Sequence, residues 1–402
     1  MKEHTLVTIV LTNCSIILQT RDMKLPVLEK AKVFGKTVFL RADLDIPLSA
    51  ISNQQSAIRG IEDDTRLKAG LPTIEYLLKN GAKIIIAGHL GRPKGFDKSL
   101  SLEPVAKWFN CHPEFISGSR SSGDEMPKQV RHNMTKTKLG EFDGWELSNN
   151  LFLLENLRFY EGEENPTTAS GLEFARKLAN LADIYVNDAF AVCHRNHASI
   201  TGVPKYLPHF AGIHLQEEIR VLSSVLENPN RPLVVIIGGA KIETKLPLVE
   251  KMRDFADFVL VGGKIAKELT EILKAQNQKV KKRKATLLVA DLNQDGFDIT
   301  PKSVDDFLQI INLAKTVVWN GPIGQISNLK SQISNQDSEY GTLKLAEGII
   351  KSKTYSIVGG GDTVGFLKNY GFLDKFSFVS TGGGAMLEFL SGKKLPGLAI
   401  LS

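Results

Sequence analysis

Short runs of apolar residues recur along this 402-residue chain. Each run is apolar at every position rather than at every second one, and this pattern is typical of strands that a parallel sheet buries on both faces. Stretches with helical periodicity separate the runs, for example over 68–80 and 171–181. The alternation predicts an α/β protein built from βαβ units. The expected strands lie at 37–40, 83–87, 151–154, 183–186, 233–237, 258–261, 316–319 and 356–358.

The βαβ pattern occurs twice, and the two occurrences are separated by one long helix. That helix is expected over 214–228, where apolar residues form a single stripe and Pro229 ends the helical pattern. It could connect two domains, act as an ordinary packing helix, or do both. The fold class that we predict is α/β, with two doubly wound parallel-sheet (Rossmann-like) domains joined by a hinge helix.

Composition narrows the class of protein without identifying it. The chain is 42% hydrophobic and 23% charged, as in ordinary soluble globular proteins, and its net charge is only +6. The one basic cluster, at 279–284, is interpreted as a solvated turn rather than a nucleic-acid site. Three widely spaced cysteines without a CxxC pair indicate neither a zinc site nor a disulfide framework, which fits a reducing cytoplasm.

Several segments are expected to lie outside the folded core. Residues 1–22 contain apolar stretches too short and interrupted for a membrane span, and we interpret them as a non-core extension. The phrase Ile-Ser-Asn recurs at 51–53, 326–328 and 333–335 in polar surroundings, and 111–134 has little apolar periodicity. We interpret these stretches as surface insertions rather than structural repeats.

A glycine-rich loop, Gly359-Gly360-Gly361-Asp362-Thr363, follows the last expected strand and precedes a helix. Three glycines allow a tight turn whose N–H groups face an anion, and the helix N-terminus adds a positive dipole. A carboxylate beside a phosphate needs a cation between them, and Mg²⁺ binds nucleotide phosphates in this way. The loop therefore suggests a Mg-nucleotide site, although a plain glycine turn with an Asp N-cap would have the same sequence pattern.

A second glycine pair, Gly238-Gly239, follows the strand at 233–237 and is followed by Lys241 and Lys245. The two lysines are four residues apart and so share a helix face. Their ammonium groups would suit a phosphoryl group in transfer, but they could equally be solvated surface. The chain has no GxxxxGK[ST] motif, so it is not a P-loop enzyme.

In the first half of the chain, charged and polar residues follow the expected strands. They occur at 40–45, 88–93, 155–159 and 187–197, and Arg66 begins the next helix. Ligands of doubly wound sheets bind outside the carboxyl ends of the strands, so these groups should converge there. Any single arginine could be a surface salt bridge, but together they favour a small polyanionic substrate.

These motifs, taken in order, resemble those of the phosphoglycerate kinase family. The resemblance extends from about Met23 to Ser402. It rests on LRADLDIP at 40–47, GHLGRP at 88–93, ENLRFY at 155–160, YVNDAF with HRNH at 185–197, GGAKIETK at 238–245, WNGP at 319–322, GGGDT at 359–363 and STGGGA at 380–385.

The resemblance implies a hinge-bending, cytosolic, monomeric enzyme that transfers a phosphoryl group between 1,3-bisphosphoglycerate and ADP in glycolysis, with Mg²⁺ as cofactor and no nucleic-acid or membrane partner. It implies a 3-phosphoglycerate domain over 23–210, a connecting helix over 211–228, a Mg-nucleotide domain over 229–390 and a tail over 391–402 that returns to the first domain. A catalytically impaired family member that binds ligands or a partner is the alternative.

The implied site residues fall into three groups. The substrate would contact Asp43, Asp45, Arg66, His89, Arg92, Arg158 and Arg195. The nucleotide would contact Gly238, Gly239, Lys245, Asn320, Gly360, Gly361, Asp362 and Thr363, with Asp362 as the metal ligand. Arg66, Lys241 and Lys245 would be catalytic.

Three positions depart from the family pattern. Asp45 replaces a usual Asn and would face an anionic substrate, which could weaken binding. Thr300 replaces a usual Gly near the nucleotide. Ser327 aligns with a Glu that contacts the ribose, a role that Glu339 could take over.

Overall fold

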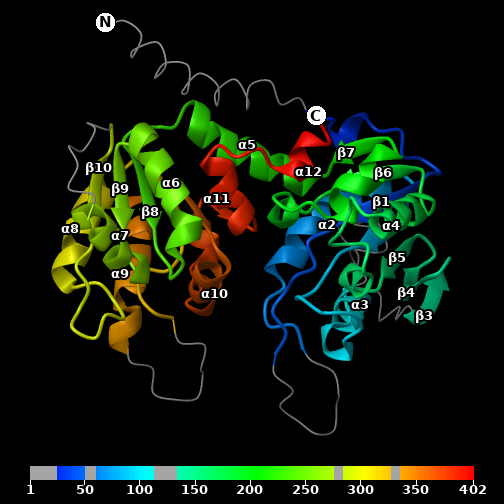
Figure 1. The fold of residues 1–402 in the computed structure, drawn as a ribbon, viewed down its shortest axis with the longest axis horizontal. Helices are drawn as coiled ribbons and strands as arrows, with labels where there is room; N and C mark the ends of the chain where they lie inside the picture. The colour runs from blue at the N-terminus through cyan, green and yellow to red at the C-terminus, as the bar shows by residue number, and fades with distance from the viewer. Residues whose placement is uncertain (1–24, 50–59, 113–133, 276–283, 327–335) are drawn as a thin grey trace, which may run out of the picture. The chain divides into compact units, whose positions relative to one another are not determined.

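The computed structural model describes residues 25–49, 60–112, 134–275, 284–326 and 336–402. The described chain divides into two compact units (Figure 1), and each is considered by itself. The N-terminal unit contains residues 25–219 together with Lys394–Ser402, and the C-terminal unit contains Arg220–Lys393. The boundary falls within helix α5 (Ile213–Glu227), close to the helix that the sequence predicts over 214–228.

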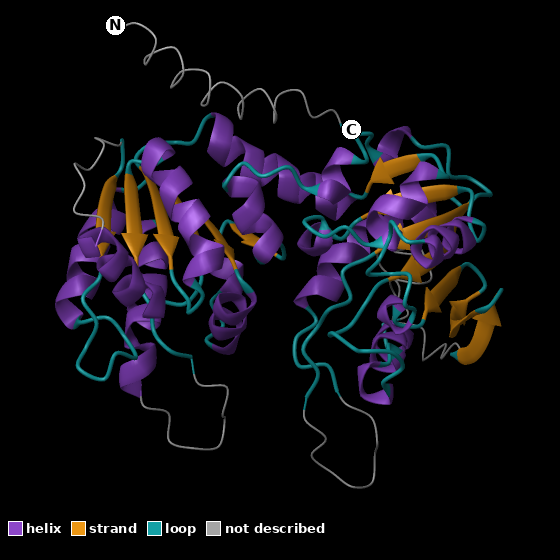
Figure 2. Cartoon of the chain, viewed as in Figure 1, coloured by secondary structure: helices purple, strands orange, loops and turns teal. Residues whose placement is uncertain are grey.

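The N-terminal unit is built on a sheet with the strand order β3-β4-β5-β2-β1-β6-β7. Its strands are β1 (Thr37–Arg41), β2 (Lys83–Ala87), β3 (Thr135–Leu139), β4 (Phe142–Ser148), β5 (Leu151–Leu154), β6 (Ile184–Asn187) and β7 (His209–Ala211). Helices α2 (Thr65–Lys79), α3 (Glu103–Asn110) and α4 (Ala169–Ala179) flank the sheet (Figure 2), and α12 (Pro396–Ala399) lies in the C-terminal tail.

The C-terminal unit is built on an all-parallel sheet with the order β10-β9-β8-β11-β12-β13. Its strands are β8 (Leu233–Ile237), β9 (Phe258–Val261), β10 (Thr286–Val289), β11 (Thr316–Asn320), β12 (Tyr355–Gly359) and β13 (Phe378–Ser380). Its helices are α6 (Ile242–Phe255), α7 (Lys264–Ala275), α8 (Pro301–Leu313), α9 (Gln336–Ser352), α10 (Gly361–Asn369) and α11 (Gly384–Leu390).

The predicted fold class is confirmed, and each of the eight expected apolar runs forms a strand. The first sheet also contains two antiparallel pairings that were not predicted, because β3 pairs with β4 and β4 with β5 in antiparallel fashion. The sequence pattern missed β3 because this edge strand is polar and largely exposed. It missed β4 because buried and exposed residues mix along that strand instead of forming a continuous apolar run.

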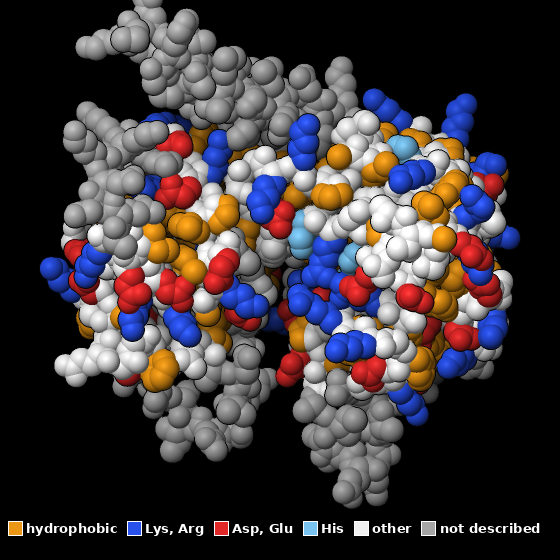
Figure 3. Space-filling model, in the orientation of Figure 1, with side chains coloured by type: hydrophobic (Ala, Val, Ile, Leu, Met, Phe, Trp, Pro, Cys, Tyr) orange, Lys and Arg blue, Asp and Glu red, His pale blue; other side chains and the backbone are white. Residues whose placement is uncertain are grey.

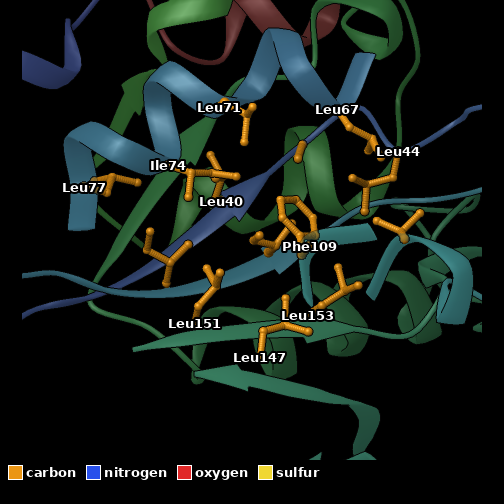
Figure 4. Packing of buried hydrophobic residues seen from close by; sticks show 14 of the residues in the cluster. Leu40, Leu44, Leu67, Leu71, Ile74, Leu77, Phe109, Leu147, Leu151 and Leu153 are labelled. Atoms are coloured by element: carbon orange, nitrogen blue, oxygen red, sulfur yellow. The ribbon is translucent and has the colours of Figure 1, made fainter. Parts of the chain in front are cut away.

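A hydrophobic core joins α2 to the sheet of the N-terminal unit (Figure 4). Leu71 and Ile74 of α2 face Leu40 of β1, while Leu151 and Leu153 extend the same cluster along β5. These side chains are at most 6% exposed, and burying each contributes about 1.5–3 kcal/mol relative to leaving it in water. This packing fixes the start of α2, where Arg66 lies, relative to the carboxyl end of β1.

The tail of the chain belongs to the N-terminal unit. The Gly397 N–H donates to the Cys193 carbonyl over 2.9 Å, and the Asn187 side chain donates to the Gly397 carbonyl over 3.4 Å. A Cβ on Gly397 would lie 2.8 Å from a methyl group of Ile200, so only glycine fits this close approach. The predicted insertions at 51–53 and 333–335, the predicted extension at 1–22 and most of 111–134 lie outside the described residues.

Candidate active site

Asp43 and Arg66 form an ion pair just beyond the carboxyl end of β1. Asp43 Oδ1 lies 3.2 Å from Arg66 Nη1, and the side chains are 4% and 26% exposed. Asp43 is the largest cause of the raised pKa of Arg66, with smaller contributions from Asp45 and Asp63. The guanidinium is therefore held in a fixed orientation while part of its donor edge stays accessible to an anion.

Asp45 is bound to the loop that follows β2. Its Oδ1 accepts a hydrogen bond of 2.8 Å from the Gly91 N–H, and its Oδ2 lies 3.9 Å from His89 Nε2. Gly91 has φ +65°, a left-handed conformation that favours glycine. The carboxylate thus has a structural use, orienting the 88–93 loop, in addition to the contact with substrate that the resemblance implies.

Three more arginines of the predicted set interact electrostatically, with Arg195 acting on Arg158 and Arg92 acting on Arg195. Arg158 donates to the Gly91 carbonyl and pairs with Glu164 over 2.9 Å. Burial lowers the pKa of Arg158 and that of Arg195, and the next cause for Arg195 is the charge of Arg92. Since these like charges repel, a bound polyanion would relieve the repulsion. Lys, Arg and His side chains gather on one side of this unit (Figure 3).

A buried polar network that the sequence analysis missed lies beneath these groups. Arg41 and Glu163 are fully buried, and Ser199 links them by accepting from Arg41 Nε and donating to Glu163 Oε1. His89 and His197 border this network, with their rings 6.0 Å apart. One signal was available in the sequence, because Arg41 is a charged residue at the end of an otherwise apolar strand.

In the C-terminal unit, the predicted loop Gly359–Thr363 turns from β12 into α10. Gly360 is the N-cap with φ +97°, and Asp362 lies in the first helical turn. The first N–H groups of a helix have no partner within it, so they can donate hydrogen bonds to an anion. The Thr363 hydroxyl is buried and has no hydrogen-bond partner among the described residues. The turn is therefore a candidate anion cradle with one open side, since a Cβ on Gly361 would meet nothing within 4 Å.

Lys245 reaches this cradle from α6. Its ammonium group donates a short hydrogen bond to Asn320 Oδ1 at the end of β11. Burial lowers the pKa of Lys245 to about 8, and the Asp362 carboxylate opposes this shift. The structure therefore brings together three of the predicted residues, Lys245, Asn320 and Asp362. The charge of the Lys245 ammonium is only partly compensated by Asp362.

Gly238 and Gly239 allow close packing at the end of β8. Their N–H groups donate to the carbonyls of Asn320 and Pro322 over 3.0 and 2.8 Å. A Cβ on Gly238 would lie 2.2 Å from the Pro322 carbonyl oxygen, which excludes any other residue. Lys241 is the exposed N-cap residue of α6, one helical turn before Lys245.

The departures from the family pattern have local explanations where the structure describes them. Thr300 caps α8, accepting from the Ser303 N–H over 3.2 Å at φ −64°, so this position does not require glycine. Glu339 accepts a hydrogen bond of 3.3 Å from the Tyr370 hydroxyl. Ser327 lies outside the described residues.

The candidate protein ligand fits a magnesium ion whose remaining ligands come from a nucleotide and water. Asp362 is an exposed carboxylate beside the candidate anion cradle. Among the described residues, no group of three or more His, Cys, Asp or Glu side chains could hold a metal. Mg²⁺ is commonly held by one or two carboxylates together with substrate phosphates and water, so a single Asp362 is sufficient on the protein side.

Comparison with known proteins decides the family. The sequence model described as "Phosphoglycerate kinase" matches residues 28–293 and 270–393. A phosphoglycerate kinase of Dictyoglomus turgidum is 36% identical over 91% of this chain and 96% of its own length. The chain belongs to the phosphoglycerate kinase family. The resemblance stated from the motifs is thereby confirmed, and the enzyme class is that of a phosphotransferase.

Other members of the phosphoglycerate kinase family agree. The enzyme of Nostoc sp. is 38% identical over 93% of this chain and 97% of its own length. The structure of phosphoglycerate kinase from Coxiella burnetii superposes with a TM-score of 0.68 at 31% identity, covering 94% of this chain and 98% of that one. The Pyrococcus horikoshii enzyme gives 0.71 at 28% identity, covering 93% and 98%. None of the described helices combines the length and apolar character needed to cross a membrane.

Proposed function

We propose that this chain reversibly transfers the acyl phosphate of 1,3-bisphosphoglycerate to ADP, forming 3-phosphoglycerate and ATP with Mg²⁺. The observation that carries the proposal is the grouping of Lys245, Asn320 and Asp362 at the N-terminus of α10. The acceptor is an ADP oxygen that is already anionic, so the reaction needs positioning and charge neutralisation rather than a nucleophilic side chain.

In the N-terminal unit, we propose that the arginines and His89 hold the glycerate ligand. Arg66 is oriented by Asp43 and keeps a partly accessible edge, which suits the transferring phosphoryl group. The mutual repulsion of Arg92, Arg158 and Arg195 favours a ligand that carries several negative charges.

In the C-terminal unit, we propose that Gly360, Gly361 and Thr363 cradle the nucleotide phosphates while Gly238 and Gly239 pack close to the nucleotide. Lys245 would neutralise phosphate charge, and Lys241, exposed one turn earlier, would follow the transferring group. Asp362 would hold Mg²⁺, whose role when bound is to screen the phosphate oxygens during the approach of the acceptor.

The arrangement of the protein is proposed from the same chemistry. We propose a 3-phosphoglycerate domain over 23–210, a connecting helix over 211–228, a nucleotide domain over 229–390 and a returning tail over 391–402. Hinge closure would bring the two ligands together and exclude water, because an exposed acyl phosphate would hydrolyse. We further propose that the protein acts as a cytoplasmic monomer.

The test is turnover in a coupled assay with ATP and 3-phosphoglycerate, with and without Mg²⁺. We expect Mg-dependent turnover from the wild-type chain and a loss of at least about a hundredfold in Arg66→Ala. Arg176→Ala is the matched control, because Arg176 is an exposed residue of α4 whose guanidinium lies over Tyr206, which is not among the predicted site residues. Well-folded protein without Mg-dependent turnover would exclude the proposed function.

A further inference from the structure

Arg41 is held in one orientation by three hydrogen bonds. Its Nε donates to Ser199 Oγ over 2.8 Å, its Nη1 to the Ala42 carbonyl over 2.6 Å, and its Nη2 lies 3.0 Å from His89 Nδ1. The side chain is fully buried, as is that of Glu163, whose Oε1 lies 4.0 Å from Arg41 Nη2. The planar guanidinium therefore has no freedom to rotate away from His89.

The contact with Arg41 determines which nitrogen of His89 carries the proton. A guanidinium has five N–H donors, no acceptor, and stays protonated in proteins. His89 Nδ1 must therefore accept, and a neutral imidazole that accepts at Nδ1 carries its proton on Nε2. Protonating Nδ1 as well would set one N–H against another and place two cations in contact.

The surroundings of His89 also favour its neutral form. Burial is the largest cause that lowers its pKa well below the ordinary value, and four nearby groups that are or can become cationic add to it: Arg41, Arg158, His197 and Arg195. The carboxylates on this side are Asp45, 3.9 Å from His89 Nε2, and Glu163 and Glu164, which lie 3.6 Å from His197 Nδ1 and 3.9 Å from His197 Nε2. His89 should therefore stay neutral throughout the physiological pH range.

The Nε2–H of His89 is left for a ligand. The atom is buried and has no hydrogen-bond partner among the described residues. Asp45 Oδ2, at 3.9 Å, is beyond hydrogen-bonding distance. The other Asp45 oxygen already accepts from the Gly91 N–H, which fixes the carboxylate.

We propose that Arg41 is a positioning residue that fixes His89 as the neutral Nε2–H tautomer, so that this N–H is a permanent donor to the anionic substrate. The inference rests on the proposed function and deepens it, because it gives His89 the role of a neutral donor rather than a cation. Arg41 does not touch the substrate in this account. It acts through the ring that it orients.

The direct test is the protonation state of His89 in the full wild-type chain, measured by two-dimensional ¹⁵N–¹H NMR of labelled histidine side chains. The signal of His89 is assigned by its loss in His89→Gln. We expect the Nε2–H pattern with no titration between about pH 5.5 and about pH 8. An Nδ1–H pattern, or titration near the ordinary histidine pKa, would overturn the proposal.

Substitution then tests the part played by Arg41. In Arg41→Met, the His89 tautomer should become mixed and the ring should begin to titrate. The KM for 3-phosphoglycerate should rise about tenfold while the KM for ATP stays unchanged, since one hydrogen bond to a charged ligand is weakened. The KM of Arg41→Met for 3-phosphoglycerate, relative to that of wild type, should become smaller as the pH falls below about 6.5, because His89 of the variant can then take up a proton.

Ser199→Ala is the matched control for loosening the buried network. It removes the acceptor of Arg41 Nε but leaves Arg41 beside His89, so the tautomer should be retained. If Arg41→Met raises the KM while His89 stays neutral with its proton on Nε2, Arg41 is merely structural and the proposal fails. If wild type shows the Nε2–H tautomer but no turnover, the proposed function fails and the tautomer assignment stands. Should Arg41→Met not fold, the wild-type titration alone decides.

Discussion

Burial of Lys245 predicts a measurable uptake of protons when nucleotide binds. The pKa of Lys245 is lowered from 10.5 to about 8, chiefly because the amine is desolvated. At about pH 8, roughly half of the molecules therefore carry a neutral amine in the absence of ligand. Nucleotide phosphates beside the amine would favour its charged form and raise the pKa again. Binding of ADP at about pH 8 should then take up as much as about half a proton per site, and at about pH 7 only about a tenth.

The same shift has a defined sign in the stability of the unliganded chain. Because the native pKa lies below the unfolded value, the folded state disfavours the charged amine. The cost is fully present below about pH 8 and vanishes as the pH rises toward 10.5, with an upper bound of about 3 kcal/mol. Lys245→Met should accordingly raise the free energy of unfolding at about pH 7 by at most about 3 kcal/mol. The loss of the hydrogen bond that Lys245 donates to Asn320 reduces this gain.

Isothermal titration calorimetry of ADP binding, in two buffers with different ionisation enthalpies, measures the proton uptake. The difference in apparent enthalpy should be large at about pH 8, small at about pH 7, and absent at both in Lys245→Met. Lys344→Met is the control, since Lys344 is a partly exposed residue of α9 paired with Glu347, and it should retain the full uptake. Equal enthalpies in both buffers at about pH 8 for wild type would refute the reasoning.

Three further predictions concern single carboxylates. Asp362→Ala should lower kcat by at least about a hundredfold while the affinity for 3-phosphoglycerate, measured by titration, persists; equal losses of both would count against a metal role. Asp45→Asn should lower the KM for 3-phosphoglycerate in steady-state assays by removing a negative charge, and an unchanged KM would show that the Gly91 contact is its main role. Asp298→Asn should cost at most about 1–3 kcal/mol of stability in urea unfolding, because the carboxylate accepts N–H bonds of 2.7 Å from both Ile299 and Gly341 and an amide can accept only with its single oxygen. Removing the buried charge, whose pKa burial raises to about 6, offsets part of this cost. An unchanged urea midpoint would contradict this.

The strands were predictable wherever burial on both faces made the sequence continuously apolar. That condition holds for the central strands β1, β2, β8 and β11, whose side chains are almost all buried. The condition fails at the sheet edge, where β3 is polar and largely exposed. The antiparallel direction of β4 was not predictable either, because no local sequence pattern encodes the direction in which strands pair. The positions of β3 and β4 in the sheet depend on contacts between residues that are distant in sequence, which a local pattern does not show.

The candidate site was predictable where its residues carry charge or glycine after a strand. Asp43, Arg66 and Lys245 all lie beyond strand ends as expected. The supporting groups were not predictable, because Glu163 and Ser199 are distant in sequence from Arg41 and become its partners only in the fold. Asp298 illustrates the same limit, since burial raises its pKa to about 6 through a setting that the sequence does not display.

The central claim is that the two ligands bind to different units, and titration of each ligand into two variants tests it most directly. Arg66→Ala should lose affinity for 3-phosphoglycerate and keep wild-type affinity for ADP. Lys245→Met should show the reverse, with weakened ADP binding and unchanged affinity for 3-phosphoglycerate. If either variant loses both ligands while its unfolding curve stays native, or if neither loses any, the assignment of glycerate to the Arg66 unit and nucleotide to the Lys245 unit is contradicted.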